Sequence, residues 1–162
     1  MTTTTALAAT SFRLPRVLGA IVASGTVAGL VDIGSASVIY GAAPDRVMRA
    51  IARGLIGDAA VHGGAPAALL GALLQVFIAI GAATVYVTAA SRLPVLFRRP
   101  VLCGLPFGAG VFCVMRFIVV PLSLAPSKLA FSPSLVFDFA ANCMFGAIIA
   151  VIASRMLRAA TR

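Results

Sequence analysis

The sequence predicts an all-α membrane protein: a bundle of four transmembrane helices with a short interfacial amphipathic helix between the first and second. Hydrophobic residues make up 61% of the 162 residues and charged residues only 10%, against about 25% charged in average soluble domains. The mean hydropathy is +1.09, and four long apolar stretches alternate with basic residues. A soluble chain this short cannot bury so much apolar surface. We therefore exclude a soluble enzyme, a disordered chain and a secreted disulfide-bonded scaffold.

A single transmembrane domain is expected over residues 17–154, between an N-terminal tail (1–16) and a basic C-terminal tail (155–162). The first predicted span covers 17–40. As a helix it reaches about 36 Å, which is enough to cross a hydrocarbon core of about 30 Å. We interpret it as an uncleaved span, because a signal peptide has a shorter apolar core and basic residues nearer its start.

The other three spans are predicted at 66–90, 101–122 and 133–153. Basic residues follow the second and fourth spans, and a proline lies near the end of the third. The fourth span opens with Ser132-Pro133. This pair is typical of a helix start, because serine caps the first free amides and proline fits the first helical position.

The connection between the first two spans contains a predicted helix at 45–56, with the sequence DRVMRAIARGLI. Arg46, Arg49 and Arg53 fall on one face of this helix, and the apolar residues fall on the other. Such a helix lies flat at the membrane interface, here expected on the outer side. We expect the arginines to attract anionic lipid headgroups, with a role in gating or partner docking as the alternative.

Candidate metal ligands are few. Asp58 and His62 are four residues apart and can meet on one helical face. One histidine and one aspartate make a poor metal site, so a surface hydrogen bond is the favoured interpretation. The cysteines lie in apolar runs without CxxC spacing, which is typical of small core residues; they are Cys103, Cys113 and Cys143. We expect no metal and no cofactor.

The distribution of basic residues predicts the orientation. Eight lysines and arginines lie at the two termini and in the second loop, and four lie in the first and third loops. Because cytoplasmic segments carry the excess of basic residues, both termini of this multi-pass protein are expected in the cytoplasm. The same residues explain the net charge of +9. No nucleic-acid partner is expected, since no basic helix with interleaved aromatic residues is present.

Each predicted span also contains a polar residue at a similar depth. These residues lie 16 or 17 positions from the basic residue at the cytoplasmic end of their own helix, and they are Asp32, Gln75, Arg116 and Asp138. At about 1.5 Å per residue, all four lie roughly 25 Å from the cytoplasmic anchors. The spacing predicts one polar layer in the outer half of the bilayer, which Asn142 completes on the fourth helix.

Energetics favour contact between the members of this layer. An isolated charge near the bilayer centre costs about 2.5–3.5 kcal/mol on insertion scales. We therefore predict a buried cluster in which Arg116 pairs with Asp32, Asp138 or both, because a guanidinium can bind two carboxylates. Gln75 and Asn142 are expected to complete the hydrogen bonds.

Small residues flank the polar ones and predict the inner faces of the helices. Gly25 and Gly29 form a GxxxG motif on the same stripe of the first helix as Asp32. Gly71 occupies the corresponding stripe beside Gln75 on the second helix. Small residues let two transmembrane helices approach closely, so we expect these stripes to face other helices.

The polar layer leaves three roles open: a structural ion cluster, a proton- or ion-handling site, or a binding site for a polar headgroup or small solute. The expected function is accordingly small-solute or proton/ion transport. The alternative is a non-catalytic accessory or structural subunit of a membrane complex. A homo-oligomer or larger membrane complex fits either role. We expect no enzyme, because no catalytic triad or phosphate-binding loop is recognisable. The apolar cytoplasmic halves of the helices argue against a continuous pore in the monomer.

Several segments resemble the YagU-like family of uncharacterised four-span bacterial inner-membrane proteins. The segments are GTVAGLVDIGSASV (25–38), RAIARGLIGDAAVHGGAPAALLGALLQ (49–75), LPVLFRRPVLCGLPFGAGVFCVMRFIVVPLS (93–123) and FSPSLVFDF (131–139). The resemblance implies a four-span topology and a place in the bacterial inner membrane, and it implies no activity. The chain departs from the family near Gln75 and Asn142, where the family has histidines, and near Arg116, where it has asparagine. No role of those family residues is carried over.

Overall fold

A computed structural model of the protein describes residues 14–124 and 134–158. Over these ranges it is helical and contains no strand, and four helices are long and apolar enough to cross a membrane. The predicted four-helix membrane fold is thus confirmed. The helices are α1 (Leu14–Tyr40), α2 (Pro44–Ile56), α3 (Ala59–His62), α4 (Gly64–Arg92), α5 (Val95–Arg98), α6 (Pro100–Val114), the π-helix η1 (Met115–Val119), α7 (Val120–Leu122) and α8 (Ser134–Arg158). The predicted helix start at Ser132-Pro133 lies outside the described residues.

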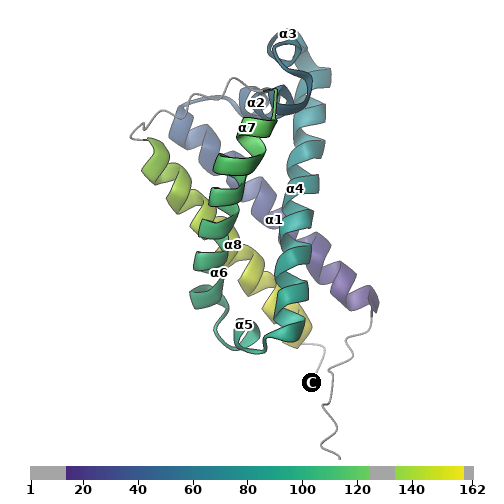
Figure 1. Ribbon diagram of the computed structural model, residues 1–162. Helices are drawn as coiled ribbons and strands as arrows, with labels where there is room; N and C mark the ends of the chain where they lie inside the picture. Colours follow the sequence, from purple (N-terminus) through teal and green to yellow (C-terminus); the bar gives the residue numbers. More distant parts are fainter. Residues whose placement is uncertain (1–13, 125–133, 159–162) are drawn as a thin grey trace, which may run out of the picture.

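The spans are α1, α4, the continuous α6–η1–α7 segment and α8. They alternate in direction, so α1 begins and α8 ends at the same end of the bundle (Figure 1). The short helix α5 lies at that end as well, whereas α2 and α3 lie at the opposite end. We call these the α5 end and the α2 end.

Helices α1 and α4 pack together along the small-residue stripes that the sequence predicts. A Cβ atom on Gly25 would lie 2.9 Å from the carbonyl oxygen of Ala79, and one on Gly29 would lie 3.1 Å from the Ala79 Cβ. The two backbones therefore touch directly. Such close contact allows extensive van der Waals packing, one of the forces that associate helices in lipid, where apolar burial gives little driving force.

Helices α6 and α8 touch through a second set of glycines. A Cβ on Gly108 would lie 2.8 Å from the Cα of Cys143, and one on Gly146 would lie 2.6 Å from the Cα of Gly108. A Cβ on Gly104 would lie 2.7 Å from the Cα of Ala147. No residue larger than glycine fits these positions without moving a helix.

The packed core lies toward the α5 end. It consists of buried side chains from α1, α4 and α8, most of them alanine. Tyr86 is the largest fully buried side chain among the described residues. Its hydroxyl donates a hydrogen bond of 3.1 Å to the carbonyl of Leu96 in α5, and its ring meets Phe107 edge-on at 5.2 Å. This end of the bundle is closed by side chains.

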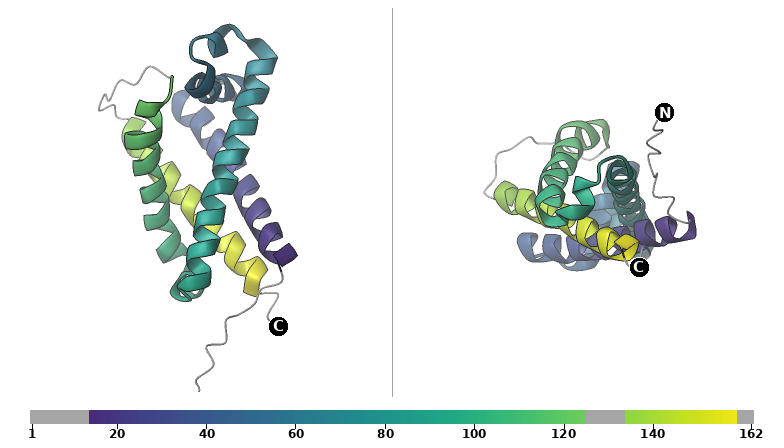
Figure 2. Two further views of the ribbon diagram at one scale, coloured as in Figure 1. Left: turned by 45° about the vertical axis from the view of Figure 1, so that its right-hand side comes forward. Right: turned by 90° about the horizontal axis from the view of Figure 1, so that it is seen from below.

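The α6–η1–α7 segment is the least enclosed of the spans. Only 6% of its most apolar part is buried inside the protein, against between 22% and 39% in the other spans. It packs against α8 and, toward the α2 end, stands away from α1 and α4 (Figure 2). The π-helix has a local cause, because Pro121 lacks an amide hydrogen and its ring would collide with the carbonyl of Phe117 in an α-helix. A π-turn relieves this collision and is common at functional sites.

Helix α2 lies across the α2 end of the bundle (Figure 2) and contacts both sides of it. On one side its backbone at Met48 lies directly against Gly71 of α4, where a Cβ would overlap the Met48 carbonyl oxygen. On the other side the carbonyl of Gly54 accepts a hydrogen bond of 3.0 Å from the amide of Leu124, just after α7. The helix thus bridges the two walls that diverge beneath it.

Candidate functional site

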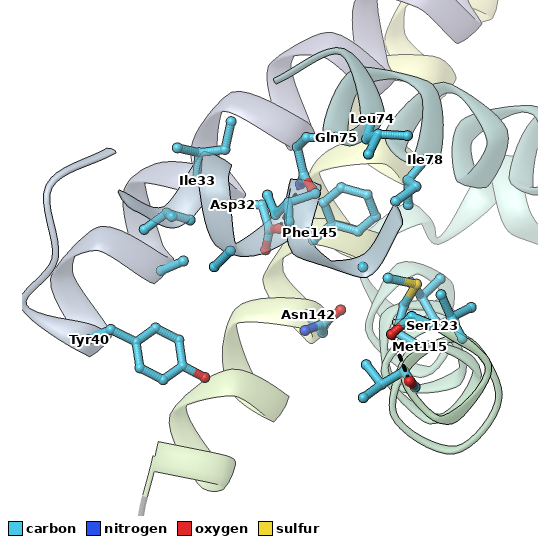
Figure 3. Close-up of a pocket in the computed structure, with 18 of the residues that line it drawn as sticks. Asp32, Ile33, Tyr40, Leu74, Gln75, Ile78, Met115, Ser123, Asn142 and Phe145 are labelled. Atoms are coloured by element: carbon cyan, nitrogen blue, oxygen red, sulfur yellow. Dashed lines mark hydrogen bonds between the residues drawn. The ribbon is translucent and has the colours of Figure 1, made fainter. Parts of the chain in front are cut away.

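A pocket of about 650 Å³ lies beneath α2, in the half of the bundle that the core does not fill. Its walls come from α1, α4, the α6–η1–α7 segment and α8, and α2 covers it. Most of the lining is aliphatic, including Leu74 and Ile78 on one wall and Met115 and Val119 on the other. Figure 3 shows Leu74, Ile78 and Met115 around the cavity. The apolar core separates this pocket from the α5 end.

The lining becomes polar at the deep side of the pocket. We call Asp32, Gln75 and Asn142 the polar floor. The Nε2 of Gln75 donates a hydrogen bond of 2.8 Å to Oδ2 of Asp32. Gln75 is buried, whereas Asp32 is half-buried. This contact joins α1 to α4 and confirms that the two residues share a depth.

Asn142 lies across the pocket from Asp32 (Figure 3). Its Nδ2 donates a hydrogen bond of 2.9 Å to the backbone carbonyl of Asp138, one turn earlier in α8. This bond fixes which side of the amide carries the nitrogen, because the carbonyl of Asp138 can only accept. The Oδ1 atom of Asn142 therefore remains as an acceptor.

A smaller pocket of about 190 Å³ adjoins the first, and Asp32, Met115 and Asn142 line both. Arg116 and Asp138 line only the smaller one. Asp138 also accepts a short hydrogen bond from the hydroxyl of Tyr40 at the end of α1. The predicted polar residues thus gather in one region of the bundle.

The prediction of one buried Asp/Arg/Asp layer is nevertheless wrong. Only Gln75 is buried, and Asp32, Arg116, Asp138 and Asn142 are each half-buried on pocket walls. The two carboxyls also take different neutral partners, Gln75 and Tyr40. The physical reason is the divergence of the α6–η1–α7 segment from α1, which leaves a cavity where the sequence predicts packed helices. Direct pairing of Arg116 with either carboxyl stays a prediction.

The arginines of α2 are largely neutralised within the protein. Arg49 pairs with Asp45 at 3.0 Å, and Arg53 donates a hydrogen bond of 2.8 Å from Nε to Asp58. Arg46 is exposed and borders the larger pocket. The headgroup attraction expected from all three arginines therefore falls mainly to Arg46, and this role stays a prediction.

Asp58 is engaged by Arg53 instead of by His62, so the predicted surface hydrogen bond between Asp58 and His62 is not the one formed. The reason is geometric: Gly57 at φ +62° ends α2, and Asp58 precedes the short α3 instead of continuing one helix. Among the described residues no group of three metal-ligating side chains occurs. Of the cysteines predicted for the core, Cys113 is exposed and the others are half-buried.

Several pocket residues are not apparent from the sequence. Tyr40, Met115 and Ser123 line the larger pocket, yet the sequence places Tyr40 merely at the end of a span. A signal does exist for the wall that contains Met115: a proline inside a predicted span, Pro121, indicates local distortion of that helix.

No protein-family model, curated protein or solved structure matches the chain. The resemblance to the YagU-like family therefore stays a prediction, and the function has to be argued from the pocket.

Proposed function

We propose that this integral membrane protein binds a small solute in the pocket beneath α2 and serves in its transport, without catalysing a reaction on it. The observation that carries the proposal is the pocket itself. It encloses about 650 Å³ at membrane depth and has a polar floor of Asp32, Gln75 and Asn142 beneath aliphatic walls. Ligand sites typically enclose about 300–1,000 Å³ and combine apolar walls with a few placed polar groups.

Ionisable residues within a membrane support the same role. Polar side chains at membrane depth are costly, and they are found where they face a bundle interior or a water-filled cavity. A purely structural layer would be packed and dry. Here Asp32 and Asn142 instead keep part of their surface exposed to the cavity.

We further propose that the protein lies in a bacterial inner membrane with both termini in the cytoplasm. The warrant is the excess of basic residues on that side, together with the alternation of four spans. In this orientation the pocket beneath α2 is reached from the periplasmic side. The packed core that contains Tyr86 then lies toward the cytoplasm.

Reporter fusions test this orientation. Alkaline phosphatase is active only in the periplasm, so a fusion after residue 162 is expected to be inactive. The same reporter inserted within the 125–133 connection is expected to be active. Activity at the C-terminal fusion would contradict the orientation.

Cysteine labelling tests the pocket. In a variant without native cysteines, Ala36→Cys places a thiol on the lining of both pockets, and Ala83→Cys places one in the core, where Ala83 is fully buried. A membrane-impermeant cationic methanethiosulfonate reagent, added to intact spheroplasts, is expected to modify position 36 and spare position 83. Equal protection of both thiols would contradict the proposal.

An accessory or structural subunit is the second candidate, and the openness of the α6–η1–α7 segment favours it. Only 6% of its most apolar part is buried, so away from its contact with α8 this span exposes side chains to lipid or to a partner subunit. The two candidates differ in water access, because a subunit that only docks through α6 does not need a hydrated Asp32. Labelling at position 36 therefore also separates them.

A further inference from the structure

The polar floor of the larger pocket presents hydrogen-bond acceptors. Gln75 donates to Asp32 through Nε2, and Asn142 donates to the Asp138 carbonyl through Nδ2. Each amide thereby directs its nitrogen to a protein partner. Three oxygens receive no hydrogen bond from any described residue: Oδ1 of Asp32, Oε1 of Gln75 and Oδ1 of Asn142.

The charged residues that line the two pockets also favour a ligand that donates hydrogen bonds and carries a positive charge. Asp32 is the carboxylate on the lining of the larger pocket. The smaller pocket is lined by the carboxylates of Asp32 and Asp138 and by the guanidinium of Arg116, so acidic groups outnumber basic ones there. Arg46 is exposed and belongs to α2, so it lies at the outer edge of the pocket. The deep side of the larger pocket therefore favours a cation.

The pocket walls indicate that the remainder of the ligand is apolar. Above the floor they are aliphatic or aromatic, with Leu74, Ile78, Met115 and Phe145 among them. An apolar body removes this surface from water, which favours binding through the hydrophobic effect. A strongly hydrated inorganic cation gains nothing from such walls.

We infer that the pocket binds a lipophilic amine: an organic cation whose ammonium group donates hydrogen bonds to Asp32 and to the amide oxygens of the floor, and whose apolar body fills the space beneath α2. This inference rests on the proposed function and names its class of solute. An ammonium supplies the donors that the floor lacks, and its charge matches the carboxylate. A charge-assisted hydrogen bond contributes about 1.5–3 kcal/mol, roughly ten- to a hundredfold in affinity.

Three probes with one apolar body test the inference: 1-adamantylamine, 1-adamantanol and 1-adamantanecarboxylate. Binding of the radiolabelled amine is measured by scintillation proximity on the full chain in lipid nanodiscs, with empty nanodiscs subtracted. The amine is expected to bind saturably, the alcohol to compete more weakly, and the carboxylate to compete least. Equal or stronger competition by the carboxylate would overturn the inference.

Variants identify the group that recognises the amine. Asp32→Asn keeps the shape and a hydrogen bond to Gln75, and it is expected to weaken amine binding by about ten- to a hundredfold. Asp45→Asn is the matched control: it removes a carboxylate from exposed α2 and is expected to leave amine affinity unchanged. Unchanged affinity in Asp32→Asn, with a normal gel-filtration profile, would contradict the role of Asp32.

A protection measurement keeps the inference testable even if Asp32→Asn fails to fold. In the folded Ala36→Cys protein, 1-adamantylamine is expected to slow thiol modification at position 36, and 1-adamantanecarboxylate is not. If neither probe slows modification at position 36, the inference that the pocket binds an amine is wrong, but the pocket is still accessible to water. Absence of modification without any probe would instead contradict the proposed function.

Discussion

Replacing Gly108 by alanine is expected to destabilise the protein by about 2–3 kcal/mol, the upper part of the range for overpacked cores. The new Cβ would lie 2.8 Å from the Cα of Cys143 and would overlap the carbonyl of Asn142. Both neighbours are backbone atoms of α8, so neither can move away without shifting the helix. Because α6 packs mainly on α8, its attachment to the bundle weakens as a unit.

Gly110 provides the matched control in the same helix. A Cβ at Gly110 meets nothing within 4 Å, so Gly110→Ala is expected to be neutral or to stabilise by up to about 1 kcal/mol through helix propensity. Unfolding of both variants by sodium dodecyl sulfate in mixed micelles measures the difference. If Gly108→Ala and Gly110→Ala unfold at the same detergent fraction, the close contact between α6 and α8 does not exist.

Replacing Gly71 by alanine is expected to release α2 from α4. The Cβ would overlap the carbonyl of Met48, which lies in the middle of α2. Amide exchange over residues 44–56 is expected to accelerate by about tenfold or more, since displacing a packed helix costs about 1–3 kcal/mol of local stability. The four spans are expected to keep their exchange rates, because α2 lies outside their shared core.

Gly81→Ala is the control on the same helix, since a Cβ there meets nothing within 4 Å. Hydrogen exchange followed by mass spectrometry compares the two variants with the parent. Equal protection of 44–56 in Gly71→Ala and Gly81→Ala would mean that α2 does not depend on this contact. It would then not serve as the fixed cover of the pocket.

The sequence determines the spans and one of the polar contacts. Hydropathy locates the four long helices because a bilayer accepts only segments that satisfy their own backbone hydrogen bonds. Counting residues from the basic anchors places Asp32 level with Gln75, and the two side chains do meet at 2.8 Å. This succeeds because α1 and α4 are regular, antiparallel and held together at Gly25 and Gly29.

The same counting fails on the other two helices for two reasons. It gives depth but neither the lateral separation of helices nor their rotation, and the α6–η1–α7 segment stands away from α1 and α4 toward the α2 end (Figure 2). Asp138 lies only four residues after the start of α8. It accepts a hydrogen bond from Tyr40, which lies eight residues beyond Asp32 on α1. Equal counts therefore do not mean equal neighbours when helices tilt and diverge.

The cover of the pocket is the least predictable feature. The sequence indicates an amphipathic helix at 45–56 but not where its faces point. Its backbone packs on Gly71, a contact that depends on the absence of a side chain in α4. Asp45 and Asp58 form ion pairs with Arg49 and Arg53, so the predicted basic face of this helix is mostly neutral.

A structure of the full chain in a lipid nanodisc, at a resolution that shows ordered water, reveals whether the pocket beneath α2 is hydrated. Water or a bound solute is expected within hydrogen-bonding distance of Oδ1 of Asp32 and of Oδ1 of Asn142, beneath an ordered α2. Closure of the α6–η1–α7 segment onto α1 and α4, with Asp32 contacting only protein groups in a dry interior, would contradict this expectation.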